Sequence, residues 1–249
     1  MEQGKSVEKG PQIEGKDLYE LLIAKGVRNL HHANTVKTSL TYITNDALLS
    51  RHYVESLALV QTSQYTDEKD KELGIWDSVF LDGLDLHKKF VKPNKYGPIL
   101  FYIDLSLLLD SEFSWVRVTK SNPDSWRPPE TSFFENVNDI NQNYLSGNKL
   151  DDGRIMFLFD NPDKKISLSK YCRKIVVDDP RIELTFSDGT VTKIAEMVKA
   201  SIEKAIDDCK ITGIDVEIRH PNLDGCNCYH LYKRMYEHSK EIFDKLFQK

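Results

Sequence analysis

The sequence predicts a globular α/β (α+β) protein, and three observations support this. Apolar runs of strand length occur at residues 99–103, 155–159 and 174–177. Around them, apolar side chains recur at three- and four-residue steps, the spacing of amphipathic helices. Of the 249 residues, 40% are hydrophobic and 29% are charged, which is typical of a globular chain with a sizeable buried core.

The N-terminal elements follow from these patterns in chain order. Residues 1–16 are polar and predict a disordered tail. A short amphipathic helix is expected at 17–24, a first strand at 27–32, and a second helix from Val36. The charge-dense segment 61–73 has few apolar anchors and predicts a surface loop.

The middle of the chain supplies the expected central strands. A short strand is predicted at 78–81. The turn residues of 93–98 precede the apolar run 99–103, which is the strongest candidate for a central strand. The proline-rich segment 121–130 predicts a loop.

From residue 181 onward the pattern changes to β-α-β-α. Strands are predicted at 182–186 and 214–218, with a helix between them and an amphipathic helix closing the chain. We therefore divide the ordered chain into 17–180 and a C-terminal extension, 181–249. The pattern leaves open whether this extension is an appended module or the far layer of the same fold.

Charge and cysteine usage narrow the class of protein. The net charge of −5 gives no general attraction for nucleic acid, so any polyanion contact needs a local basic face. No apolar run reaches the roughly 20 residues of a membrane span, and the N-terminus lacks a signal sequence, so we expect a cytoplasmic protein without a membrane partner. The cysteines form no disulfide framework, and Cys226 and Cys228 have C-x-C spacing rather than the usual zinc spacing.

The most informative stretch is Leu30–Val36, which is followed by a predicted helix and then by Leu48–Arg51. It resembles the opening of the ADP-ribosyltransferase fold, where a strand ends in a His-x-Thr element and a helix follows. The resemblance implies that His32 binds the ribose of NAD and that Asn34 binds its amide. A neutral imidazole can donate and accept hydrogen bonds at once, which suits a ribose hydroxyl. The alternative is that the histidine pair forms a polar rim beside a helix.

The stretch Tyr96–Asp104 resembles the middle strand of the same family, where an aromatic ring flanks the nicotinamide. A ring face there can stack on the pyridinium. Tyr102 is the candidate and Phe101 the alternative, because successive strand residues point to opposite faces. Either ring could instead fill the core.

The third element of the family is a glutamate at the start of a late strand, which steadies the oxocarbenium ion as nicotinamide leaves. Aligning the segment around 155–168 with that pattern places Arg154 at the glutamate position. Arginine cannot supply a negative charge, so the expected catalytic glutamate is not found. Instead, Arg51 or Arg154 is expected to meet the pyrophosphate or a polyanionic target through its planar guanidinium.

Within the family, the pattern is most similar to the DNA-targeting ADP-ribosyltransferase (DarT-type) toxins, over residues 27–178. This resemblance implies a fold of split mixed sheets, with NAD as the substrate. His32, Tyr102 and Arg154 take the catalytic positions, and nucleic acid is the expected acceptor in a toxin or phage-defence setting. The alternative is an inactive relative that binds nucleotide or nucleic acid.

A second alternative is a metal-dependent nuclease. Asp77, Asp82, Asp85 and His87 lie within eleven residues, and Asp104 follows the next predicted strand. Such oxygen ligands with an imidazole can hold Mg²⁺ or Mn²⁺. No Glu-x-Lys triplet follows Asp104, so the pattern lacks the usual partner of a nuclease core, and we predict no metal site.

Overall fold

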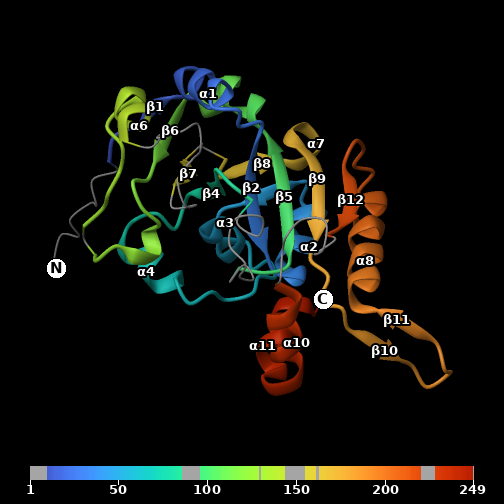
Figure 1. The fold of residues 1–249 in the computed structure, drawn as a ribbon. Coiled ribbons are helices and arrows are strands. Elements are labelled where there is room, and N and C mark those ends of the chain that lie inside the picture. Colours follow the sequence, from blue (N-terminus) through green and yellow to red (C-terminus); the bar gives the residue numbers. More distant parts are fainter. Residues whose placement is uncertain are drawn as a thin grey trace.

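The computed structural model of the chain describes residues 10–85, 96–128, 130–143, 155–160, 163–219 and 228–248. Within them, a mixed sheet of eight strands runs through the molecule in the order β1-β6-β7-β4-β2-β5-β9-β12 (Figure 1). In this spatial order the strands are β1 (Ile13–Glu14), β6 (Trp115–Val118), β7 (Met156–Phe159), β4 (Val79–Asp82), β2 (Asn29–Asn34), β5 (Ile99–Asp104), β9 (Cys172–Val177) and β12 (Asp215–Ile218).

Helices surround this sheet (Figure 1). They are α1 (Gly15–Ala24), α2 (Val36–Thr44), α3 (Arg51–Ser56), α4 (Asp67–Glu72), α6 (Val137–Asn143), α7 (Leu168–Tyr171), α8 (Ile194–Asp208), α10 (Cys228–His238) and α11 (Lys240–Phe247). Three short 3₁₀ helices are η1 (Leu105–Leu109), η2 (Ser111–Phe113) and η3 (Pro123–Ser125). Two small strand pairs complete the fold: β3 (Ala47–Leu49) with β8 (Lys165–Ser167), and β10 (Glu183–Thr185) with β11 (Val191–Lys193).

The sheet is split between β2 and β4. On one side, β2 pairs antiparallel with β5 over six residues, from Asn29 opposite Asp104 to Asn34 opposite Ile99. On the other side, the register of β2 with β4 consists of one residue pair, His31 opposite Asp82. The two strands therefore diverge beyond this pair, and the end of β2 is left facing a gap in the sheet.

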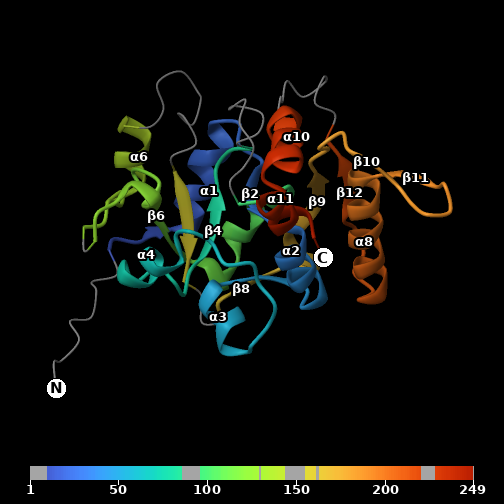
Figure 2. The ribbon, with the colours of Figure 1, turned by 90° about the horizontal axis from the view of Figure 1, so that it is seen from below.

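The C-terminal extension joins the same sheet and core. β12 pairs in parallel with β9 at the edge of the sheet, from Asp215 opposite Lys174 to Ile218 opposite Val177. α8 packs against α2 and places its apolar side chains in the core cluster of the N-terminal part. α11 also contacts α2 (Figure 2), whereas the β10–β11 hairpin projects from the body in both views.

The predicted α/β (α+β) class and most predicted elements are confirmed. Where segments differ, tertiary contacts explain the difference. Within the predicted tail, Ile13 is ordered, since it is 3% exposed and pairs with Val116 in the sheet. Within 61–73, α4 forms because Asp67 at its start is held by an arginine from α3. The closing helix is divided in two at Ser239, whose backbone leaves helical geometry. Among the described residues, no helix is long and apolar enough to cross a membrane.

Candidate active site in the split sheet

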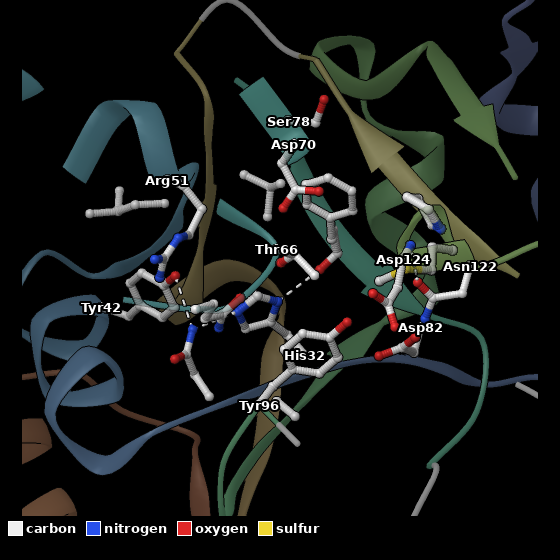
Figure 3. A pocket seen from close by; sticks show the side chains of 18 residues that line it. His32, Tyr42, Arg51, Thr66, Asp70, Ser78, Asp82, Tyr96, Asn122 and Asp124 are labelled. Carbon is white, nitrogen blue, oxygen red and sulfur yellow. Dashed lines mark hydrogen bonds between the residues drawn. The ribbon is translucent and has the colours of Figure 1, made fainter. Parts of the chain in front are cut away.

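A pocket lies where β2 and β4 diverge (Figure 3). Its space, open mouth and adjoining solvent included, is about 670 Å³. The walls come from the end of β2, α2, α3, the segment leading into α4, β4 and η3. The polar lining consists of His32, Asn34, Tyr42, Arg51, Gln64, Thr66, Asp70, Ser78, Asp82, Tyr96, Asn122 and Asp124.

His32 stands in the middle of the pocket in a defined tautomer (Figure 3). Its Nδ1 lies 2.7 Å from the carbonyl oxygen of Phe80. A carbonyl only accepts, so Nδ1 carries the proton and Nε2 is an acceptor. Burial lowers the pKa of His32 to about 4, so the imidazole is neutral at pH 7. The pocket therefore contains a neutral imidazole with an unprotonated Nε2, and the predicted contact of His32 with ribose stays a prediction.

Asn34 holds His32 and Tyr42 in place. Its Nδ2 donates to the Tyr42 hydroxyl at 3.2 Å and lies 3.4 Å from Nε2 of His32. Its Oδ1 accepts the backbone N–H of Thr35 at 2.9 Å. Asn34 is 1% exposed, so both ends of its amide already have protein partners. In this arrangement Asn34 orients the histidine, and its pairing with a ligand amide stays a prediction.

Arg51 lines the pocket, but its charge is balanced within the protein. Its Nη2 donates to both carboxylate oxygens of Asp67 at 2.8 and 2.7 Å, and its Nη1 donates to the carbonyl oxygen of Thr62 at 3.0 Å. The guanidinium also lies over the Trp76 ring. The buried Nε has no acceptor among the described residues. Arg51 thus organises the segment before α4, and most of its hydrogen-bonding capacity is used within the protein.

Two carboxyl groups on the pocket wall have strongly raised pKa values. Burial raises the pKa of Asp82, which is 6% exposed, to about 7. Burial also raises the pKa of Asp70 to about 7, although a hydrogen bond from the Thr66 side chain opposes the shift. Carboxyls with pKa values near neutrality can exchange protons at physiological pH. The pocket therefore offers acid–base groups without a glutamate.

Tyr102 does not share the pocket with His32. In the β2–β5 register Tyr102 lies opposite His31, and the two rings meet edge to face at 4.6 Å. Its hydroxyl donates to Asp85 at 2.7 Å on that face of the sheet. His32 lies opposite Phe101, which is fully buried in the core. The expectation that Tyr102 and His32 face one another is therefore corrected, because neighbouring strand positions alternate between faces.

Tyr96, at the start of the stretch Tyr96–Asp104, is the aromatic residue of that stretch that lines the pocket. Next to it, Gly97 has φ +142°, and a Cβ there would lie 2.2 Å from the backbone oxygen of Asn34. The signal for this close approach was the Tyr-Gly-Pro turn ahead of β5. Tyr42 also carried a signal, since it lies two helical turns beyond Asn34. No pattern in the sequence pointed to Asp70, because its charge-dense segment predicts a solvated loop.

The other predicted residues are dispersed or outside the described part. Arg154 and His87 lie outside the described residues. Asp77 pairs with Lys164, whereas Asp104 caps η1 and pairs with Arg173. Within the described ranges, no group of three or more His, Cys, Asp and Glu side chains could hold a metal ion. The acids of the nuclease alternative therefore do not converge there.

A buried ionic network occupies the face opposite the pocket. Arg219 donates through Nη1 to Asp85 at 2.9 Å and through Nε to Asp178 at 2.7 Å. The Tyr232 hydroxyl donates to Asp178 at 3.0 Å. Arg219 and Asp178 are 2% and 1% exposed. Because Arg219 and Tyr232 come from the C-terminal extension, this network ties the extension to β5 and to the end of β9.

Comparison with known proteins identifies the fold. No family model and no curated protein match the chain in sequence. The structure of Thermus sp. 2.9 DarT in complex with ADP-ribosylated ssDNA aligns with a TM-score of 0.50 at 10% identity, covering 78% of this chain and 95% of that one. Complexes of the same DarT with NAD⁺ and carba-NAD⁺ have TM-scores of 0.46 and 0.45, each at 10% identity, covering 78% of this chain and 96% of that one. The chain therefore has the ADP-ribosyltransferase-like fold of DarT, with its candidate site in the split of the sheet.

Proposed function

We propose that the protein binds NAD in this pocket and transfers ADP-ribose to a nucleic acid. The observation that carries the proposal is the neutral His32, held with Nε2 unprotonated at the split of a DarT-like sheet. Nε2 has only a long contact of 3.4 Å with the Asn34 amide, so a ribose hydroxyl can take the place of that contact and donate to Nε2. Tyr96 supplies the aromatic surface for the nicotinamide, in place of Tyr102.

The chemistry requires a group that stabilises positive charge. When the bond between C1′ and nicotinamide breaks, nicotinamide leaves with the electron pair and the ribose becomes an oxocarbenium ion. The nucleophile of the acceptor then bonds to C1′ and gives up a proton. We assign both tasks, stabilising the oxocarbenium ion and accepting the proton of the nucleophile, to the carboxyl groups of the pocket. Asp82 or Asp70, when ionised, stabilises the cation and accepts the proton.

The proposed acceptor is a nucleic acid, and the same comparison supports it. The DarT structure that shares this fold contains ADP-ribosylated ssDNA. This supports a nucleic-acid acceptor for the present chain, whereas the toxin or phage-defence setting is proposed from the sequence resemblance alone. The acidic net charge of −5 means that recognition depends on local contacts near the pocket rather than on long-range attraction.

The test measures binding and turnover separately. NAD binding is followed by isothermal titration calorimetry, and nicotinamide release and ADP-ribosylated product are followed by mass spectrometry with mixed single-stranded DNA and RNA. We expect wild type to bind NAD and modify one of the nucleic acids, and Asp82→Asn with Asp70→Asn to retain binding but lose turnover. NAD binding by wild type without turnover would establish the inactive relative instead. If wild type shows neither NAD binding nor turnover, the proposal is wrong.

A further inference from the structure

Tyr65 adjoins the pocket, because it lies between the lining residues Gln64 and Thr66 in the chain and its hydroxyl bonds to the lining residue Asp124. The residue is 59% exposed. Exposure alone does not distinguish it, because Trp115 on β6 is 56% exposed and does not line the pocket. What distinguishes Tyr65 is that an aromatic ring in contact with solvent lies directly beside the proposed NAD site.

The hydroxyl of Tyr65 is held by two residues that line the pocket. Its hydroxyl donates to Oδ2 of Asp124 at 2.9 Å and shares a hydrogen bond with the Tyr96 side chain. Asp124 is itself held, because its N–H donates to Oδ1 of Asn122 at 2.9 Å and its carbonyl accepts from Lys69 at 2.5 Å. Both Asp124 and Tyr96 line the pocket. The hydroxyl of Tyr65 is thus anchored by pocket residues, and the residue as a whole is 59% exposed.

We propose that Tyr65 is a stacking platform for a planar heteroaromatic base at the pocket mouth. The base is either the adenine of NAD or a base of the nucleic-acid acceptor. This inference rests on the proposed function and deepens it. A ring that is already immobilised loses little conformational entropy when a base stacks on it. Stacking also suits a protein of net charge −5, because it provides contact with a nucleic acid without relying on phosphate attraction.

The experiment compares four full-length proteins: wild type, Tyr65→Ala, Tyr65→Phe and, as a control of matched exposure, Trp115→Ala. NAD binding is measured by calorimetry, and binding of labelled single-stranded DNA and RNA by fluorescence anisotropy. We expect Tyr65→Ala to weaken one ligand about tenfold, which corresponds to about 1.4 kcal/mol. Tyr65→Phe keeps the ring and stays within about twofold of wild type, as does Trp115→Ala. The ligand that weakens identifies the source of the base.

Two results overturn the inference. One is that Tyr65→Ala binds NAD and both nucleic acids as wild type does. The other is that Tyr65→Phe loses as much ligand affinity as Tyr65→Ala. In that case the hydrogen bond to Asp124, and not the ring, is responsible for binding. Both leave the proposed function intact, since wild type still binds NAD. If wild type binds neither NAD nor nucleic acid, the proposed function and this inference fail together. Unchanged melting temperatures of the Tyr65 variants confirm that the ring acts on ligands and not on the fold.

Discussion

The imidazoles of His31 and His32 point to opposite faces of the central sheet. His32 donates from Nδ1 to the Phe80 carbonyl at 2.7 Å inside the pocket. His31 packs edge to face on Tyr102, with ring centroids 4.6 Å apart. The two neighbouring histidines therefore have separate roles, and a variant of His31 serves as the control for the same variant of His32.

Replacing His32 tests the proposed contact with ribose. We expect His32→Ala to weaken NAD binding about tenfold or more, because a ligand hydrogen bond and the packing around it are both lost. His31→Ala should leave the affinity for NAD nearly unchanged, since His31 lies on the other face. Calorimetric titration of both variants gives the answer. Equal losses in the two would contradict the separation of roles.

The aromatic contact of nicotinamide is tested with Tyr96 and Tyr102. Tyr96→Leu should reduce NAD affinity several-fold, because a flat ring facing the pyridinium is lost. Tyr102→Phe should leave that affinity unchanged and destabilise the fold by about 1 kcal/mol, since it removes the hydrogen bond to Asp85. Urea unfolding measures the second effect. A loss of NAD affinity in Tyr102→Phe would restore the original sequence prediction.

Burial of His32 has a consequence for stability at acid pH. Its pKa is lowered from the ordinary value of 6.5 to about 4, so between these pH values the unfolded chain binds more protons than the folded one. The contribution of His32 is therefore fully present above about pH 6.5 and is lost as the pH falls to about 4. The difference in unfolding free energy between wild type and His32→Gln should shrink by on the order of 2–3 kcal/mol over this window. Urea titrations at a series of pH values measure it, and a constant difference would argue against a buried neutral imidazole.

Asp82 has the opposite pH dependence. Its pKa is raised from 3.8 to about 7, so the folded state binds more protons than the unfolded state between these values. Stability from this group is present below about pH 4 and is lost as the pH rises to about 7. The unfolding free energy of Asp82→Asn relative to that of wild type should therefore rise by on the order of 2–4 kcal/mol between pH 4 and pH 8. An unfolding series in urea at several pH values checks this, and a gain of the same size at pH 4 and pH 8 would contradict it.

We expect Arg219 to be essential for holding the C-terminal extension against β5 and the end of β9. Arg219→Ala leaves Asp85 and Asp178 as uncompensated buried charges, and we expect a loss of about 3–5 kcal/mol in unfolding free energy. The matched control is Arg173→Ala, which removes a half-exposed pair with Asp104 and should cost less than about 1 kcal/mol. Similar losses in both variants would show that the buried network contributes little.

The regular elements were largely predictable from local pattern. The alternation and apolar runs that place strands at 99–103 and 174–177 depend only on neighbouring residues, and so do the helical spacing after Val36 and the polar end of the first strand. Short strands such as Trp115–Val118 were missed, because four residues carry too little periodicity to stand out. The helix in 67–72 was missed because its stability depends on Arg51, which is distant in sequence.

The sequence by itself determined the fold class, the order of the main elements and the polar strand end that carries His32 and Asn34, since these follow from side-chain chemistry and spacing along one segment. Only the tertiary structure decided which face each residue occupies and which charges remain available. It turned Tyr102 away from His32, neutralised Arg51 with Asp67, and brought Asp70, Asp82 and Tyr96 from three separate segments to one pocket. The physical reason is that pKa values, ion pairs and pockets depend on burial and on neighbours remote in the chain, which no local pattern records.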